Sequence, residues 1–69
     1  METSIFLKEV GNKVQAARKA KKMSLEKMSK LSGINASNLR LLENGQRDID
    51  ILSLKNIADV LGINLKNLM

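Results

Sequence analysis

Apolar residues along this chain of 69 residues recur every three or four positions rather than at every second one. That period matches the 3.6 residues of a helical turn and is typical of helices that bury one face. Proline is absent from the chain, and Phe6 is its only aromatic residue. The pattern therefore predicts an all-α fold, and the length predicts a single domain that commits most of its apolar residues to one core.

The first helix is expected to run from about Ser4 to Lys22. Its inner stripe consists of apolar residues spaced three or four apart, namely Leu7, Val10, Val14 and Ala17. Gly11 lies within this helix, where glycine costs about 1 kcal/mol relative to alanine. A glycine at this place predicts close packing against another element rather than a break in the helix.

After the first helix, one pattern occurs four times: an apolar residue, a capping residue, three further residues and a second apolar residue. Its instances are Met23-Ser24 with Met28, Ile34-Asn35 with Leu39, Ile49-Asp50 with Leu54, and Ile63-Asn64 with Leu68. An apolar pair placed around a capping residue is a hydrophobic staple at the start of a helix. We therefore predict helices at about 24–31, 35–44, 50–61 and 64–68. Gly45 and Gly62 follow the third and fourth helices, where a left-handed residue is expected.

The second and third predicted helices are joined by the short turn Ser32-Gly33-Ile34. A turn of this length that contains glycine is expected in a helix-turn-helix, whose second helix can enter a DNA major groove. An ordinary helical hairpin in a small bundle has the same turn, so the turn by itself leaves both interpretations open.

The positive charge of the chain is concentrated in its middle. Lysine and arginine exceed aspartate and glutamate by five overall. From Lys13 to Arg47 there are nine cations and two carboxylates, a net charge of +7, and the remaining residues carry a net charge of −2. Such a concentration favours a polyanionic partner, although a solvated basic surface is the alternative.

The composition also excludes several classes of site. The chain has no cysteine and no histidine, so it lacks disulfides, thiolate-metal frameworks and the commonest metal ligand and general base. We therefore expect no metal, no cofactor and no enzymatic activity. No apolar run is long enough to span a membrane, and the first ten residues do not resemble a secretion signal, so a cytoplasmic location is expected. A basic helix lying on a membrane is disfavoured, because the first helix needs its apolar stripe for the core.

Several short motifs carry a family resemblance. They are Arg18 followed by the helix start at Ser24, the turn SGIN, the segment LLENG with Arg47 beyond it, and the stretch IADVLGI. From about Leu7 to its last residue the chain resembles the lambdoid phage repressor and Cro type of helix-turn-helix, also called the xenobiotic-response-element type. The resemblance implies a compact five-helix DNA-binding domain over residues 1–69, with its helix-turn-helix in the second and third helices.

Two charged residues are predicted to point inward. Arg18 lies four residues after Val14, and Glu43 lies four residues after Leu39, so each falls on or beside an apolar stripe. A bidentate arginine–carboxylate pair can satisfy both buried charges. In the proteins that the chain resembles, residues at these two positions form such a pair and lock the recognition helix against the first helix. We therefore interpret both residues as structural rather than catalytic.

The polar side of the third helix is the candidate surface for reading bases. The candidates are Ala36, Ser37, Arg40 and Leu41. Arg40 could donate to guanine O6 and N7, Ser37 could donate or accept, and an apolar residue could touch a thymine methyl group. The alternatives are a phosphate contact or a solvated charge for Arg40 and plain exposure for Leu41.

Other residues around the predicted helix-turn-helix are candidates for phosphate contacts. They are Lys22, Ser24, Lys27, Asn35, Asn38, Asn44 and Arg47. The amides at a helix start can hold a phosphate oxygen, and nearby cations can assist, although any single lysine could be idle. The family often carries glutamine at the position of Leu25 and uses it for backbone and base contacts, which leucine cannot make.

These observations predict a DNA-binding transcriptional regulator, of a repressor-like kind, that recognises a short palindromic operator without catalysis. A different class of function is a protein-interaction module such as an antitoxin, which uses the same fold to mask a toxin. The two functions can coexist in one protein, and polymerase is a further partner that a DNA-bound regulator could block or recruit.

Apolar residues near the end of the chain raise the question of assembly. Ile51, Leu54, Ile57, Ala58 and Leu61 are expected to form the inner stripe of the fourth helix. This leaves Leu52, Leu65 and Met69 as candidates for exposure. The family pairs through this region, which implies a homodimer with recognition helices about 34 Å apart. Incidental exposure of these residues is the alternative.

Overall fold

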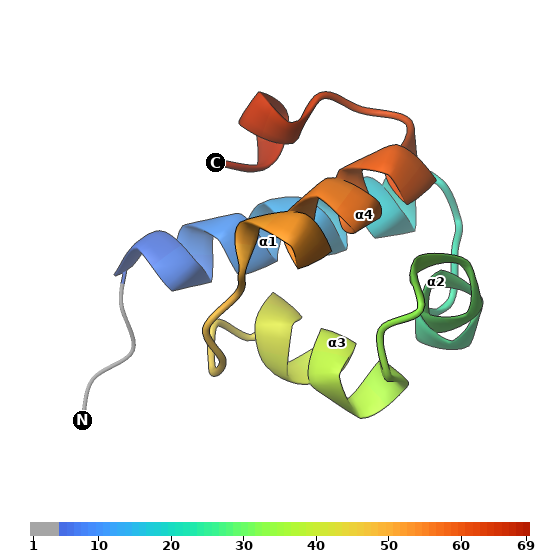
Figure 1. Cartoon of the computed structure of the whole chain (residues 1–69), viewed down its shortest axis with the longest axis horizontal. Coiled ribbons are helices and arrows are strands. Elements are labelled where there is room, and N and C mark those ends of the chain that lie inside the picture. Colours follow the sequence, from blue (N-terminus) through green and yellow to red (C-terminus); the bar gives the residue numbers. More distant parts are fainter. Residues whose placement is uncertain (1–4) are drawn as a thin grey trace.

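The computed structural model describes residues 5–69 as a small bundle (Figure 1). Its elements are α1 (Ile5–Ala20), α2 (Leu25–Ser32), α3 (Ala36–Glu43), α4 (Ile51–Leu61) and the 3-10 helix η1 (Leu65–Leu68). No strand occurs within this range. The all-α prediction is therefore confirmed, and the short fifth helix predicted at about 64–68 is a single 3-10 turn over residues 65–68 rather than an α-helix.

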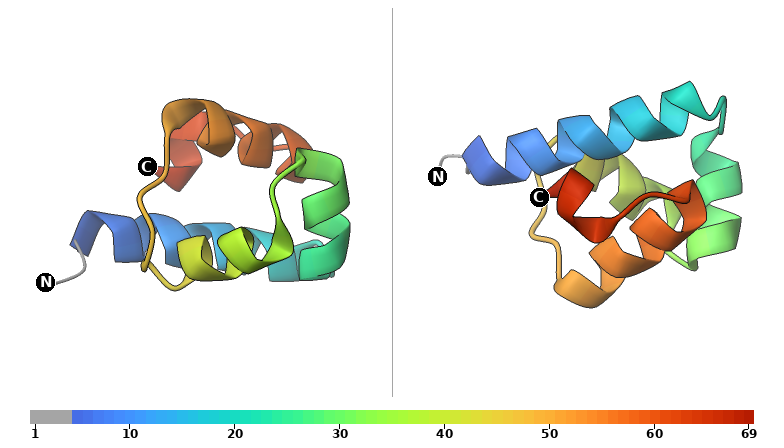
Figure 2. Two further views of the ribbon diagram at one scale, coloured as in Figure 1. Left: turned by 60° about the horizontal axis from the view of Figure 1, so that its bottom comes forward. Right: turned by 90° about the horizontal axis from the view of Figure 1, so that it is seen from above.

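The helices pack so that α3 is held along one side of the molecule. It contacts α1 and α2, whereas α2 also contacts α4, and η1 contacts both α1 and α4. Figure 2 shows α3 beside α1 in one view and η1 between α1 and α4 in the other. The connection from α2 to α3 is short, so these two helices form the predicted helix-turn-helix.

The predicted capping residues begin the helices as expected, with one exception. In each of three caps a side-chain oxygen accepts a hydrogen bond from a backbone N–H of the first turn: Ser24 from Lys27 (3.0 Å), Asn35 from Ser37 (2.7 Å) and Asp50 from Ser53 (3.1 Å). Such bonds satisfy amides that have no partner within the helix. Asn64 precedes η1 without a side-chain capping bond.

The four predicted staples also pack as expected. The residue before each cap is partly buried against the core, and the second apolar residue of each pair is buried. The partly buried members are Met23, Ile34, Ile49 and Ile63, and the buried members are Met28, Leu39, Leu54 and Leu68. Each staple thus ties the start of its helix to the same core.

Glycines close three of the helices in the left-handed conformation. Gly33, Gly45 and Gly62 have φ angles of 77°, 71° and 70°. Lys22 adopts a similar angle, φ 55°, in the turn after α1, although a side chain makes this conformation unfavourable. The left-handed turn at Lys22 brings the N–H of Met23 within 3.1 Å of the carbonyl oxygen of Arg18.

The core differs from the predicted stripes at the start of two helices. Val10 and Val14 of α1 are buried, but Leu7 is only partly buried. Ile51 was expected on the inner stripe of α4, and this prediction is wrong because its side chain is 54% exposed. Ile51 is the first residue of α4, one turn before Leu54, and Ile49, two residues earlier, is the residue here that packs partly buried against the core.

The first helix is also shorter than predicted. It ends at Ala20 rather than Lys22, and the expected start at Ser4 lies outside the described residues. Gly11 is buried within α1 against the backbone at the end of α3, so the prediction of close packing at this glycine is confirmed.

Candidate nucleic-acid interface

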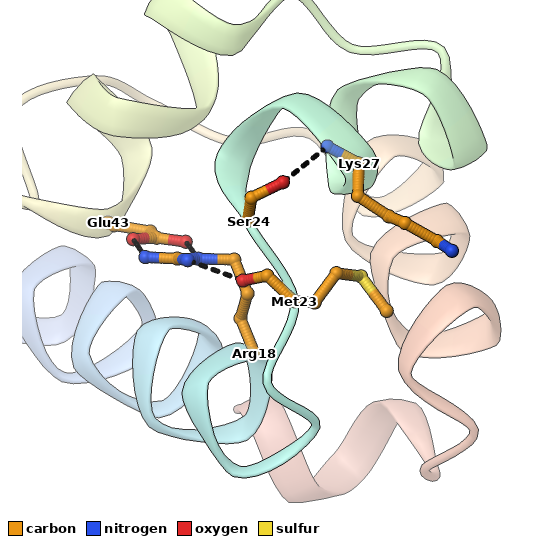
Figure 3. Close-up of polar contacts among 5 residues, drawn as sticks. All are labelled: Arg18, Met23, Ser24, Lys27 and Glu43. Carbon is orange, nitrogen blue, oxygen red and sulfur yellow. Dashed lines mark hydrogen bonds and ion pairs between the residues drawn. The ribbon is translucent and has the colours of Figure 1, made fainter.

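A buried ion pair joins α3 to α1. The Arg18 Nε donates to Glu43 Oε2 over 2.7 Å, and its Nη2 donates to Glu43 Oε1 over 3.0 Å (Figure 3). Arg18 is 8% exposed and Glu43 is 3% exposed. This is the bidentate arrangement that the inward spacing of the two residues led us to expect. Both carboxylate oxygens are satisfied, so the pair can remain charged inside the domain.

Arg18 also holds the turn between α1 and α2. Its Nη1 donates to the carbonyl oxygen of Met23 over 2.7 Å, and Figure 3 shows this bond beside the ion pair. One guanidinium therefore connects α1, the start of the helix-turn-helix and the end of α3. The hydrogen bond to Glu43 raises the pKa of Arg18 above its ordinary value. Desolvation by burial acts in the opposite direction, and the negative charges of Glu43 and Glu26 raise this pKa further. Sequence reasoning missed Met23, because a turn carbonyl leaves no signal in a side-chain pattern.

The side of α3 that faces away from the core carries the predicted base-reading residues. Ser37, Arg40 and Leu41 are exposed, and Ala36 is partly buried at the first helical position. We call these four residues the outer face of α3. The opposite side is occupied by buried Leu39, Leu42 and Glu43. The outer face can therefore meet a ligand without any change in the core.

The capping residues at the two helix starts keep hydrogen-bond donors available. The Ser24 hydroxyl oxygen accepts from the Lys27 N–H, and the hydroxyl hydrogen can still be donated outward (Figure 3). Asn35 uses Oδ1 to accept from Ser37, which leaves the side-chain NH₂ group as a donor. Both residues are exposed. Donors of this kind suit phosphate oxygens, although they are equally able to bind water.

The basic segment predicted from the sequence remains strongly positive in the folded domain. Arg18 and Glu43 neutralise one another, and the other charged residues between 13 and 47 are all exposed. They comprise eight cations and Glu26, which is a net charge of +7 from eight minus one. The cations are Lys13, Lys19, Lys21, Lys22, Lys27, Lys30, Arg40 and Arg47.

Two of the predicted phosphate residues lie in a hollow between α3 and the start of α4. Asn38 and Arg47 line it together, and Asp48 and Asp50 lie there as well. Bonds from the Ser53 hydroxyl and N–H lower the pKa of Asp50 below its ordinary value. The two carboxylates therefore offset part of the positive electrostatic potential around Arg47. Sequence reasoning assigned Arg47 without these two carboxylates, although both are its near neighbours along the chain.

The remaining site predictions fall outside the outer face of α3. Asn44 is exposed and ends α3, where its N–H bonds back to the carbonyl oxygens of Arg40 and Leu42. Leu25, which stands where the family often has glutamine, packs partly buried against the core. Its side chain therefore has a structural place in α2.

The candidate residues for self-association differ in their exposure. Leu52 is 69% exposed and Met69 is 51% exposed, but Leu65 packs partly buried against the core. Leu65, a candidate for exposure, is therefore only partly exposed. Ile51 adds an exposed apolar side chain next to Leu52 at the start of α4. Lys13 of α1 donates to the carbonyl oxygen of Met69 over 2.9 Å, which holds this end of the chain against α1.

Within residues 5–69, no group of three or more acidic side chains is arranged to hold a metal ion. None of the helices in the same range is long and apolar enough to cross a membrane.

Comparison with known proteins gives one family and several similar folds. Residues 14–68 match the family described as HTH_3, helix-turn-helix. The restriction-modification controller protein C.AhdI from Aeromonas hydrophila has a similar structure, with a TM-score of 0.88 and 30% identity; the match covers 91% of this chain and 96% of that chain. No curated protein sequence matches the chain.

Two further solved structures are similar over nearly the whole chain. An HTH_3 family transcriptional regulator from Vibrio cholerae has a TM-score of 0.87 and 25% identity, and the match covers 93% of this chain and 36% of that chain. The DNA-binding domain of BldD has a TM-score of 0.85 and 25% identity, and the match covers 100% of this chain and 99% of that chain.

Proposed function

Because the chain belongs to the helix-turn-helix family HTH_3, we propose that it is a transcriptional regulator that binds double-stranded DNA in a sequence-specific manner, with α3 in the major groove. The observation that carries this proposal is the division of α3 into two sides. Its inner side is fixed by the core and the Arg18–Glu43 pair, and its outer face is exposed amid the basic segment.

The outer face of α3 supplies the contacts to bases. Arg40 is the principal reader, because its guanidinium can donate to O6 and N7 of one guanine. Ser37 lies one turn earlier and can donate or accept, while Ala36 and Leu41 offer apolar contact to a thymine methyl group. Arg40 is not engaged by any carboxylate within residues 5–69, so its donors are available to DNA.

Phosphate contacts flank these base contacts. The start of α2 offers Lys22, the Ser24 hydroxyl and Lys27, and the start of α3 offers the Asn35 amide. Helix starts favour anions because their first amides and dipole point outward. Asn38, Asn44 and Arg47 are weaker candidates, since Asn38 is partly buried and Arg47 lies near Asp48 and Asp50.

The similar structures support the class of function that we propose, a DNA-binding regulator. One is named as the DNA-binding domain of BldD, one as a transcriptional regulator and one as a restriction-modification controller. Regulation by occupancy is the simplest mechanism for a chain of this size: bound protein covers the operator and excludes or recruits polymerase. We favour the repressor-like form, in which the bound domain blocks access.

We further propose that the chain acts as a homodimer on a palindromic operator. The exposed apolar residues Ile51, Leu52 and Met69 are the candidates for the contact, and Leu65, which is partly buried against the core, is a further one. A two-fold pair would present two copies of α3 to half-sites about 34 Å apart, one turn of DNA.

A pair of substitutions tests the proposed roles on an operator selected from random duplex DNA. Arg40→Ala should relax preference at one or two base positions by about 1–3 kcal/mol, whereas Lys27→Ala should weaken binding to all sequences alike. The readout is a set of affinities for operators with single-base changes, measured at several salt concentrations. Equal losses on every sequence for both variants would assign Arg40 to the phosphate backbone and contradict its role as a base reader.

A further inference from the structure

The end of α3 meets α1 through backbone rather than through side chains. A Cβ atom built on Gly11 would lie 2.4 Å from the carbonyl oxygen of Leu42 and 2.7 Å from that of Glu43. These distances are far below the 3.5–4.0 Å of ordinary contact. Because both neighbours are backbone atoms, no change of rotamer could relieve the clash. Only glycine at this position permits the observed approach of the two helices.

Gly45, which follows α3, makes a second close contact with the backbone of α1. A Cβ on Gly45 would lie 2.8 Å from the Cα of Lys8, again a backbone atom of α1. Together with the Arg18–Glu43 pair, the two glycines fix the same end of α3 against the same helix. We call Gly11, Gly45 and the Arg18–Glu43 pair the seat of α3.

We propose that Gly11 is a specificity-determining residue, which acts by setting the angle at which α3 enters the DNA groove. The inference rests on the proposed DNA-binding function. The seat lies at the C-terminal end of α3, and the outer face begins at the other end, where Ala36 and Ser37 lie. All four residues of the seat are buried, so they can control the direction of the helix from inside the domain.

The expected size of the effect follows from geometry. Relief of the clash in Gly11→Ala requires a displacement of about 1 Å, judged against ordinary contact distances. The eight residues of α3 span about 12 Å, so this displacement at one end corresponds to a tilt of about 5°. A displacement of this size is enough to misalign the two parallel hydrogen bonds of a bidentate contact.

The phosphate contacts should respond differently. Lys22, Ser24 and Lys27 belong to α2 and the turn before it, whereas the three atoms nearest to a Cβ on Gly11 all belong to α3. Contacts to phosphate also tolerate small displacements better than base contacts, because they depend mainly on charge. Gly11→Ala should therefore lower specific affinity and leave non-specific affinity nearly unchanged.

The test uses the full chain with the operator selected for the wild type and an unrelated duplex of equal length. The measured quantity is the ratio of the two affinities, taken at a temperature at which circular dichroism shows each variant to be folded. Gly11→Ala should lower the ratio about 10-fold, the cost of one lost base contact, with non-specific affinity within about 2-fold of the wild type. Ile57→Val, which removes a methylene group from the core on α4, is the control and should leave the ratio unchanged.

Five other results decide between the inference and its alternatives. A folded Gly11→Ala protein with an unchanged ratio overturns the inference, and so does an equal loss of both affinities. If Gly11→Ala does not fold, Arg18→Lys tests the same seat, because lysine keeps the positive charge but cannot form the two parallel hydrogen bonds to Glu43. A 10-fold lower affinity ratio for Arg18→Lys would support the inference, and an unchanged ratio would overturn it. A wild-type protein that prefers no sequence overturns the proposed function, and the inference with it.

Discussion

Among single residues, Arg18 makes the contacts on which the candidate interface most depends. Its guanidinium bonds to both oxygens of Glu43 and to the carbonyl oxygen of Met23. A buried pair of this kind adds little net stability compared with apolar residues, but loss of one partner leaves a buried charge uncompensated. The pair therefore fixes the orientation of α3 rather than simply strengthening the fold.

Glu43→Ala should lower the free energy of unfolding by roughly 3–5 kcal/mol, because it leaves the Arg18 charge buried and unpaired. A domain of this length rarely has more than about 3–5 kcal/mol of stability, so the variant should be largely unfolded at 25 °C. Urea denaturation followed by circular dichroism measures the change. Glu9→Ala removes an exposed carboxylate and should stay within about 0.5 kcal/mol of the wild type. A loss below about 1 kcal/mol for Glu43→Ala would contradict the account of the pair.

Lys22→Gly should make the protein more stable and its binding to DNA weaker. The left-handed conformation costs a non-glycine residue roughly 1 kcal/mol, and glycine removes this cost. Glycine also makes the unfolded chain more flexible, which offsets part of the gain in stability. The melting temperature is therefore expected to rise by a few degrees. Loss of one phosphate contact should reduce the slope of log affinity against log salt by about 0.9. Lys66→Ala, a charge removed outside the basic segment, should leave the slope unchanged. An unchanged slope for Lys22→Gly would remove Lys22 from the phosphate contacts.

At the scale of elements, the start of α4 depends on a titratable cap. Asp50 accepts from the Ser53 N–H and hydroxyl, and these bonds lower its pKa in the folded protein. A lowered folded-state pKa means that the bonds stabilise the fold above the unfolded-state pKa of about 3.9. This stability is lost as the pH falls through the folded-state value.

Asp50→Asn tests this cap, because asparagine caps a helix about as well without a charge. Between pH 5 and pH 2 the melting temperature of the variant should fall less than that of the wild type. Asp48→Asn, which removes the neighbouring carboxylate that makes no capping bond, should follow the wild type. Parallel curves for all three proteins would show that Asp50 contributes nothing to the acid response.

The starts of the helices show which features could be predicted from the sequence and which could not. Helix starts were predictable because a cap and a staple combine two local signals, and Ser24, Asn35 and Asp50 all form the expected caps. The outward direction of Ile51 was not predictable from period alone, since Ile51 lies at the first position of α4 and Ile49 before the helix packs against the core instead. The 3-10 geometry of η1 likewise depends on how four residues fit between α1 and α4.

At the scale of the whole molecule, the candidate interface combines residues from distant parts of the chain. The outward direction of Arg40 and the inward direction of Arg18 and Glu43 follow from helical spacing, so the sequence could predict them, whereas the pairing of Arg18 with Glu43 was implied by the family resemblance. The Met23 carbonyl bond and the carboxylates beside Arg47 depend on turn geometry, which a side-chain pattern does not specify. The partial burial of Leu65 has the same origin, because it depends on where η1 packs.

Assembly is the second property of the whole molecule that can be tested. Leu52→Lys should leave the fold intact, because the side chain is 69% exposed, and should abolish cooperative binding to a palindromic site by placing like charges across the two-fold contact. Sedimentation and DNA titration measure stoichiometry and cooperativity. Ile5→Lys is the matched control, because it changes another exposed apolar residue to lysine. Unchanged stoichiometry and cooperativity for Leu52→Lys would contradict the proposed interface.

The most direct test of the central claim is selection of bound sequences from a pool of random duplex DNA by the wild-type protein. If α3 reads bases and two copies act together, selection should enrich a consensus of two inverted half-sites whose centres are about one helical turn, or 34 Å, apart. The same protein should bind the consensus about 10³-fold or more tightly than unselected duplex at one fixed salt concentration. A pool that stays random after repeated selection, with binding that depends on salt alone, would contradict the claim that this domain recognises a DNA sequence.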